Sequence, residues 1–307
     1  KLLEMARALM SDPTLVMLDE PMAGVNPALT QSLLDHILDL KGLGMTVLFV
    51  EHDMHMVRHI ADWVVVIDDE RASGTTFTLT GPAGRLTTTV PVIGPHMAAN
   101  AALAIVMLLE GGYEWDRIAS ALDRDGGILA HLPGRTQLVS GDTGPVVFVD
   151  FGHSPDAFEK TLAAVRRVTP GKVLMLFGAD GDRDASKRFD MARTAVEGSD
   201  ILVVTDHHPR FEDPDSIRAT LVAGARATRP DAQIHEYSPP EAAIVAAVGL
   251  VGEGDSILWA GPGHQDYRDI RGVRTPYSAR ELARRALRAA GWPVPDSHWP
   301  VPYPDED

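Results

Sequence analysis

Three polar motifs that could bind a small anionic molecule follow apolar runs of strand length. The motifs are "GDRD" (181–184) after "VLMLFG", "DHHPR" (206–210) after "ILVVTD", and "GPGHQ" (261–265) after "ILWA". Open α/β sheets bind ligands in the loops at the carboxyl edge of their parallel strands. Arg183 and Arg210 could each hold a carboxylate through two hydrogen bonds. Taken singly, "GDRD" and "DHHPR" also fit solvated surface loops, so this alternative stays open.

A pair of carboxylates near the start of the chain suggests nucleotide chemistry. Asp19 and Glu20 follow the apolar run "LVML", so one could hold Mg²⁺ and the other could activate water. This chemistry needs a phosphate-binding loop of the form G-x-x-x-x-G-K-[S/T]. None of the glycine-rich stretches has that spacing. We therefore expect that the chain alone neither hydrolyses ATP nor uses it for ligation.

Composition excludes several classes of protein. The net charge of −15 over 307 residues argues against binding to nucleic acid or to an anionic membrane surface. The chain has no cysteine, which excludes disulfides and thiolate chemistry. No apolar stretch is long enough to span a bilayer, and no signal peptide is evident. We expect a cytoplasmic protein without membrane insertion.

Strand-length apolar runs alternate with amphipathic helical segments, which predicts βα units and mainly parallel sheets. The fold class we expect is α/β, with a doubly wound Rossmann-like C-terminal domain preceded by partial P-loop-type α/β pieces. The predicted strands are 14–19, 45–51, 62–68, 145–150, 172–177, 200–205, 232–236 and 255–260, with a hairpin over 74–92. The predicted helices include 1–10, 27–41, 53–61, 95–111, 114–123 and 278–290.

Changes in residue composition and in the pattern of predicted strands and helices divide the chain into four segments. Residues 1–68 form the first α/β piece, and residues 69–133 contain the threonine-rich hairpin and two helices. Residues 134–291 hold the regular βα series. Residues 292–307 are rich in proline and end in "PDED", which is typical of an extended acidic tail. We expect residues 1–68 to bury too little surface to be stable alone.

Residues 1–68 resemble the C-terminal part of ABC transporter ATPases of the branched-chain amino-acid uptake type. The resemblance rests on "LVMLDEPMAGVNP" (15–27) and "TVLFVEHDMHMV" (46–57). It implies that Asp19 binds Mg²⁺, that Glu20 is the base toward water, and that His52 contacts the γ-phosphate. It also implies a membrane permease as partner.

Residues 70–291 resemble Mur ligases, in particular those that add a diamino acid to a UDP-linked muramoyl dipeptide. The motifs are "PHMAANAALA" (95–104), "LPGR" (132–135), "VDFGHSPDAFEKTL" (149–162), "FGADGDRDASKR" (177–188), "VVTDHHPRFEDP" (203–214) and "AGPGHQDY" (260–267). Such enzymes use ATP and Mg²⁺ to activate a carboxylate as an acyl phosphate, which an amine then attacks. The resemblance implies ATP contacts from Asn100, Arg135 and Asp150. It implies an amino-acid pocket lined by Arg183, His207, His208, Arg210, Gly261 and Gln265.

Two departures from the family pattern bear on the amino acid that is accepted. "DHHPR" replaces Asp-Asn-Pro-Arg, and Gln265 replaces a glutamate, so lysine, ornithine and meso-diaminopimelate are all plausible. We do not expect a zinc site at His207 and His208, because no third ligand stands at suitable spacing. Two unrelated resemblances, each without its phosphate loop, suggest pieces joined in one sequence. We expect a ligase fragment that is inactive alone, with a transport ATPase fragment as the alternative.

Overall fold

The computed structural model describes residues 13, 15–19, 27–50, 60–130 and 132–294. These residues form two compact units. The first comprises residues 1–66 with 79–86, and the second comprises residues 67–78 with 87–307. No helix among the described residues combines the length and the apolar character that a membrane crossing requires.

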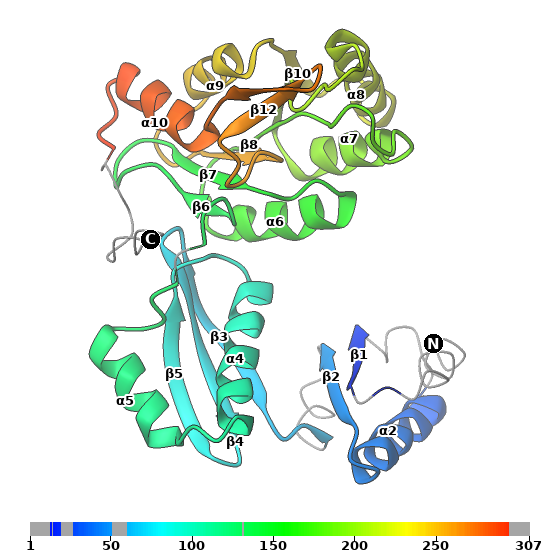
Figure 1. Ribbon diagram of the computed structural model, residues 1–307, viewed down its shortest axis with the longest axis vertical. Coiled ribbons are helices and arrows are strands. Elements are labelled where there is room, and N and C mark those ends of the chain that lie inside the picture. Colours follow the sequence, from blue (N-terminus) through cyan, green and yellow to red (C-terminus); the bar gives the residue numbers. More distant parts are fainter. Residues whose placement is uncertain (1–12, 14, 20–26, 51–59, 131, 295–307) are drawn as a thin grey trace. The chain divides into compact units, whose positions relative to one another are not determined.

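The described residues of the N-terminal piece form a β–α–β element (Figure 1). Strand β1 (Leu15–Asp19) pairs in parallel with β2 (Thr46–Val50), and helix α2 (Pro27–Gly42) connects them. Leu33, Leu34 and Ile37 of α2 form its small core. Both predicted strands and the connecting helix are confirmed. The helices predicted over 1–10 and 53–61 lie outside the described residues, except for Ile60 and Ala61.

Three short strands follow, namely β3 (Val64–Arg71), β4 (Gly74–Gly81) and β5 (Gly84–Val90), in the order β3-β4-β5. Two residues link each strand to the next, which is possible only for antiparallel neighbours. Threonine hydroxyls bond across β4 and β5, with Thr76 2.9 Å from Thr89 and Thr78 2.8 Å from Thr87. The predicted hairpin is confirmed. Helices α4 (Pro95–Glu110) and α5 (Trp115–Asp125) follow it, also as predicted.

The C-terminal domain is built on a six-stranded sheet in the order β10-β9-β8-β11-β7-β6. Its strands are β6 (Gln137–Leu138), β7 (Val146–Asp150), β8 (Val173–Phe177), β9 (Ile201–Val204), β10 (Gln233–Glu236) and β11 (Ser256–Ala260). All neighbours are parallel except the β6–β7 pair at one edge. The last long strand in sequence, β11, lies between β7 and β8.

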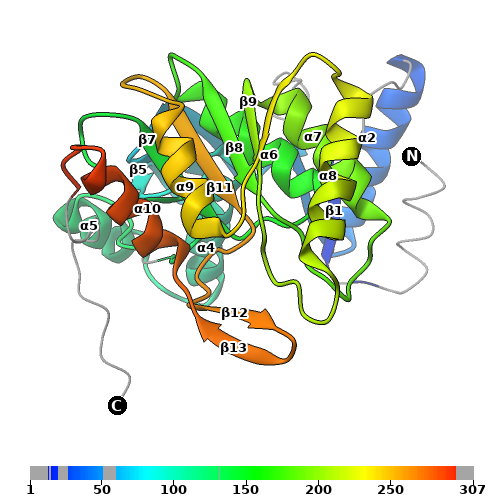
Figure 2. The ribbon, with the colours of Figure 1, turned by 90° about the horizontal axis from the view of Figure 1, so that it is seen from above.

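Alternating side chains of these strands are buried on both faces of the sheet, and Figure 2 shows helices on either side of it. Helices α6 (Pro155–Arg167), α7 (Lys187–Gly198) and α8 (Pro214–Thr228) cover the face that carries Phe148, Met175 and Leu258. Helices α9 (Pro240–Gly249) and α10 (Ala279–Ala289) cover the face that carries Leu176 and Trp259. The doubly wound Rossmann-like architecture predicted from the sequence is therefore confirmed.

Local sequence explains where these helices begin. Ser154 accepts a hydrogen bond from the backbone N–H of Ala157, and Pro155 occupies the first position of α6. Asp213 and Pro214 play the same two roles for α8. Such caps satisfy amide groups that the first helical turn leaves unpaired. The caps place the loops that precede both helices at the carboxyl edge of the sheet.

Two features of this domain were not predicted. The first is the short edge strand β6. The second is an antiparallel hairpin of β12 (Tyr267–Ile270) and β13 (Val273–Pro276), joined by Arg271 and Gly272, both with positive φ. At the other end, Trp292 and Val294 pack against the α9–α10 side of the core, so ordered packing continues past residue 291.

Candidate functional site

The loops that follow β8 and β9 approach each other closely at the carboxyl edge of the sheet. The backbone N–H of Gly181 donates to the carbonyl oxygen of His208 at 2.8 Å. A Cβ atom on Gly181 would lie only 1.9 Å from the carbonyl oxygen of Pro209. Glycine is therefore required at this position, because any side chain would push the two loops apart. This contact places "GDRD" directly beside "DHHPR".

Arg188 and Glu212 clamp the same two loops together. The Arg188 guanidinium donates to both Glu212 carboxylate oxygens, at 2.6 and 2.7 Å, and to the Asp180 carbonyl oxygen at 2.9 Å. Only 4% of the Arg188 side chain is exposed. Its hydrogen bonds hold the pKa of Glu212 below the ordinary value and raise the pKa of Arg188. Arg188 is structural, because both of its Nη groups donate to protein acceptors.

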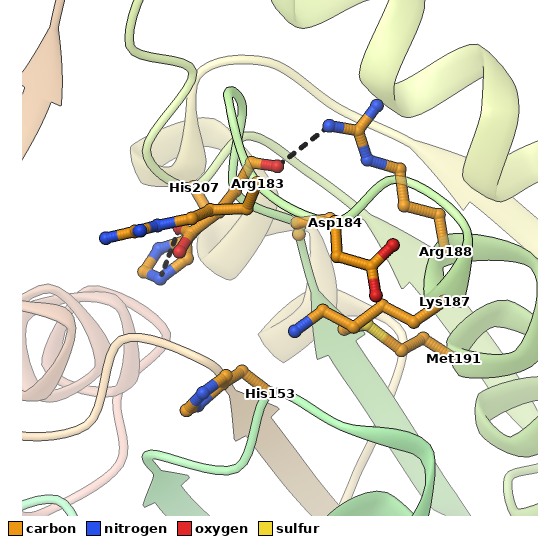
Figure 3. A pocket seen from close by; sticks show the side chains of 10 residues that line it. His153, Arg183, Asp184, Lys187, Arg188, Met191 and His207 are labelled. Carbon is orange, nitrogen blue, oxygen red and sulfur yellow. Dashed lines mark hydrogen bonds and ion pairs between the residues drawn. The ribbon is translucent and has the colours of Figure 1, made fainter.

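A pocket opens beside this clamp (Figure 3). In Figure 3, Lys187 and Met191 lie on the α7 side, while His207 and His153 lie across the pocket from them. Arg183 also lines it. Within the described part of the chain, the Lys187 and Arg183 side chains make no hydrogen bond or ion pair. The pocket therefore offers two cations that are free to bind an anionic ligand.

Asp180 stands between two of the predicted site residues. Its Oδ1 atom lies 3.6 Å from Nε2 of His207, and its Oδ2 atom lies 3.6 Å from Nη2 of Arg210. Burial strongly lowers the pKa of His207, and the positive groups around the ring lower it further. Arg210 has a φ of +53° and belongs to a strained loop whose backbone pairs with that of Asp269. The geometry thus brings Asp180, His207 and Arg210 into one cluster.

Gly261 and Gln265, the predicted residues of the β11 loop, also reach this region. Gly261 has a φ of +112°, and a Cβ atom there would lie 3.7 Å from the ring of His207. Gln265 Oε1 lies 2.8 Å from Nε2 of His208. Nδ1 of His208 is 2.9 Å from the backbone N–H of Asp269, which can only donate. In the neutral ring the hydrogen therefore lies on Nε2, and it is donated to Gln265.

Asp180, His207 and His208 are close enough to suggest a metal site. One potential ligand atom from each residue lies within 4.8 Å of the others. Our reason for not expecting zinc was therefore wrong, because a third ligand approaches in space although not in sequence. The hydrogen bonds decide the question instead. The lone pair of the His208 ring is used by the Asp269 N–H, so this ring has none left for a metal.

Two of the three residues predicted to contact ATP, Arg135 and Asp150, lie around the end of β7. Both carboxylate oxygens of Asp150 accept hydrogen bonds inside the protein, from the N–H and hydroxyl of Thr136 at 2.8 and 3.1 Å and from Gly152 N–H at 2.7 Å. Arg135 is exposed and lies 4.6 Å over the ring of Phe151. Asn100 is exposed on α4. Arg135 thus remains available to a phosphate, whereas Asp150 organises the loop that carries it.

The structure says little about the sites predicted in residues 1–68. Glu20 and His52 lie outside the described residues. Asp19 ends β1, and only its backbone is described. The roles assigned to these three residues, including Mg²⁺ binding by Asp19, therefore stay predictions.

Sequence reasoning did not single out Asp180, Lys187 or the Arg188–Glu212 pair. Asp180 and Lys187 both stand in the quoted motif "FGADGDRDASKR". An acidic residue three positions after a buried strand was the available signal for Asp180. Arg188 and Glu212 are 24 residues apart in the sequence, and no local sequence pattern predicts an ion pair over that separation.

Comparisons with known proteins agree with the Mur ligase resemblance. The family model "Mur ligase, glutamate ligase domain" matches residues 134–263. The UDP-N-acetylmuramyl-tripeptide synthetase of Leifsonia xyli subsp. xyli is 56% identical over 233 residues, which is 76% of this chain and 45% of that protein. A UDP-N-acetylmuramoyl-L-alanyl-D-glutamate–2,6-diaminopimelate ligase of Streptomyces avermitilis is 36% identical over 231 residues, covering 74% of this chain and 45% of that protein.

Solved structures show the same fold. A UDP-N-acetylmuramoyl-L-alanyl-D-glutamate–2,6-diaminopimelate ligase superposes with a TM-score of 0.55 at 23% identity, covering 90% of this chain and 53% of that one. A Mycobacterium tuberculosis folylpolyglutamate synthase complexed with ADP and AMPPCP superposes with a TM-score of 0.51 at 19% identity, covering 88% of this chain and 54% of that one.

The comparisons give no support to the ABC transporter resemblance of residues 1–68. The chain spans about half the length of the curated relatives it matches. Within that span, the family model, the two relatives and the superposed folds all agree on the segment that holds the pocket. The chain therefore carries the C-terminal domain of the Mur ligase family.

Proposed function

We propose that this chain supplies the amino-acid-binding part of an ATP-dependent ligase, which adds a diamino acid to UDP-N-acetylmuramoyl-L-alanyl-D-glutamate. The relatives with the highest identities reported above carry names that describe this reaction. The observation that carries the proposal is the pocket beside β8, where the Arg183 side chain has no partner among the residues that the structure describes. A free guanidinium at the carboxyl edge of a parallel sheet suits the carboxylate of an amino acid.

The surrounding residues would then bind different groups of the amino acid. Arg183 and Arg210 bind carboxylate groups, and Asp180 offers one negative charge to an ammonium group. His208 donates its Nε2–H group to Oε1 of Gln265, and the Gln265 amide N–H groups have no acceptor among the described residues, so they can donate to a substrate. Gln265 is a neutral amide at a position where the family pattern has a glutamate. Size and hydrogen bonding would therefore contribute more than charge to the choice of amino acid. Lysine, ornithine and meso-diaminopimelate remain the candidate amines.

Nucleotide binding rests on fewer residues. Arg135 fits a phosphate group, because it is exposed, stacked on Phe151 and free of carboxylate partners in the described residues. Bound ATP and Mg²⁺ would supply the activated carboxyl group, as in the family. Asp150 would act indirectly, by fixing the turn from Arg135 to Thr136 through its bonds to Thr136. We propose no direct ribose contact for Asp150, because its oxygens already have three donors.

A domain graft tests the proposed function. Both faces of the sheet are covered within residues 137–294, so residues 134–294 can replace the corresponding domain of a complete diaminopimelate-type ligase. Ligation of lysine, ornithine and meso-diaminopimelate is then measured. We expect Arg183→Gln to raise the amino-acid KM at least about tenfold, as expected for loss of a charged hydrogen bond.

Arg193→Gln provides the matched control, because Arg193 lies in α7, shortly after the loop that carries Arg183, but pairs with Asp190 and is half exposed. Its KM should match that of the unmodified graft. Equal effects of the two substitutions, or no ligation of any of the three amino acids, would contradict the proposed function.

A further inference from the structure

The loop between β9 and α8, residues 206–213, begins with a buried carboxylate. Only 9% of the Asp206 side chain is exposed. Its Oδ1 atom accepts a hydrogen bond from Nη1 of Arg218, and its Oδ2 atom accepts one from the Ser238 hydroxyl at 2.6 Å. Both oxygens are thus engaged by the protein, so Asp206 anchors the start of the loop.

Arg218 is the centre of this anchor. Its side chain is 8% exposed, and all three of its nitrogen atoms donate to carboxylates. Nε donates to Glu236 at the end of β10 at 2.9 Å, Nη1 donates to Asp206, and Nη2 donates to Asp215 in the first turn of α8. Because the guanidinium is planar and its donors have fixed directions, these partners define the position of Asp206 relative to α8 and β10.

The contact between Arg218 and Asp206 also closes the loop on itself. Asp213 caps α8 at the end of the loop, and Arg218 lies in the second turn of the same helix. The first residue of the loop is therefore bound to the helix that starts directly after its last residue. Holding both ends limits the conformations of the residues between them, so the loop is ordered before a ligand binds.

The residues between these two ends belong to the candidate site. The middle and the end of the loop are held by backbone bonds, in which Gly181 N–H donates to the His208 carbonyl and Arg210 N–H donates to the Asp269 carbonyl. The start of the loop is held by the Asp206 side chain. Together these anchors fix the backbone from which the side chains of the site project.

We propose that Arg218 is a positioning residue for amino-acid binding, which acts through Asp206 and does not contact the substrate. The proposal rests on the proposed function and adds to it a residue that does not line the pocket. Two parallel hydrogen bonds from Arg210 to a carboxylate require a defined placement of its guanidinium. A loop that is ordered in advance also binds its ligand at a lower entropic cost. Loss of the Arg218 contact should therefore weaken binding of the amino acid.

Two substitutions remove the contact from opposite sides. Arg218→Met removes the donors and keeps an unbranched side chain, but it leaves the buried Asp206 without its cation, which destabilises proteins. Asp206→Ala leaves Arg218 with Glu236 and Asp215, so no buried charge loses all of its partners. The second variant keeps the test valid if the first does not fold.

The first test follows the loop in the chain itself. Nitrogen-15 NMR of histidine-labelled protein reports on the His208 ring, which donates to Gln265, and His208→Gln assigns its signal. Both variants should shift this signal. Arg226→Met should not, because Arg226 lies in the same helix but donates to the carbonyls of Pro230 and Ala232 at its other end. An unchanged His208 signal in a folded variant would overturn the proposal.

The second test measures binding and turnover separately in the grafted ligase. We expect Arg218→Met and Asp206→Ala each to raise the amino-acid KM about tenfold, while kcat and the KM of ATP stay within about threefold. The double variant should raise the amino-acid KM no further, because both substitutions remove one contact. Arg218→Lys, which can still reach one carboxylate, should have a smaller effect than Arg218→Met.

A merely structural role predicts a different pattern. If Arg218 served stability alone, its loss would reduce the folded fraction and therefore kcat, while the amino-acid KM stayed within about threefold; this result would overturn the proposal. An equal rise of KM in Arg226→Met would overturn it as well. Ligation of none of the three amino acids by the unmodified graft would instead refute the proposed function, and this proposal with it.

Discussion

Replacing Arg188 by lysine should loosen the two loops that hold the pocket. Arg188→Lys keeps the positive charge but removes the planar group that donates to both Glu212 oxygens and to the Asp180 carbonyl. Lysine can satisfy at most one of these acceptors well. Two charge-assisted hydrogen bonds are lost, each contributing roughly 1.5 kcal/mol.

The expected effect is smaller than the sum of these two bonds. Glu212 is 31% exposed on its side chain, so water can replace part of what Glu212 loses. We therefore expect Arg188→Lys to destabilise the domain by about 2 kcal/mol. For a domain of this size this corresponds to a fall in Tm of roughly 4–8 °C.

Urea unfolding followed by fluorine NMR of 5-fluorotryptophan protein provides the assay. Trp259 is 1% exposed in the centre of the sheet, so its signal reports on this domain alone. Glu212→Gln and the double variant complete a double-mutant cycle, in which the coupling energy should exceed about 1 kcal/mol. If Arg188→Lys lowers the free energy of unfolding by less than about 0.5 kcal/mol, or if the coupling energy is near zero, then Arg188 and Glu212 do not hold the two loops together.

Three further predictions concern the site itself. The pKa of His207 is lowered by burial, so the unfolded ring binds protons first and stability falls as pH drops below about 6.5. His207→Gln should flatten this slope in unfolding measured between about pH 6.5 and 5, and an unchanged slope would contradict the burial argument. Gln265→Glu keeps the acceptor for His208 and adds a negative charge, so the lysine KM of the grafted ligase should fall about tenfold. Arg210→Lys should raise the amino-acid KM, because lysine cannot bind a planar carboxylate with two parallel bonds; equal KM values would remove Arg210 from the site.

Much of the fold follows from the sequence because each buried strand is a continuous apolar run. "VLMLF" and "SILWA" are buried at every position, so both faces of the sheet had to be covered by helices. The short strands escaped prediction for the opposite reason. Every residue of β13 is exposed, so no apolar pattern marks it, and only its pairing with β12 defines it.

The candidate site followed from the sequence only in its strand-end residues. Arg183, His207 and Arg210 stand in the loops that follow β8 and β9, which the sheet topology brings together. Long-range pairs such as His208 with Gln265, 57 residues apart, needed the folded backbone. Whether Oδ1 of Asp180 has a hydrogen-bond donor depends on how the neighbouring donors are paired in the folded protein, and this cannot be predicted from the sequence.

The position of β11 has a consequence for how the domain folds. Strands β7 and β8 are not neighbours, because β11 lies between them and pairs with both. Residues 256–260 are therefore synthesised last among the long strands, yet they complete the middle of the sheet. Pairing segments so far apart in sequence slows folding, since a long loop must close before any contact forms. During synthesis, β7 and β8 must wait with exposed edges, which is a state prone to aggregation. A chain that ends before Ser256 would keep five of the six strands and still be unable to form the sheet.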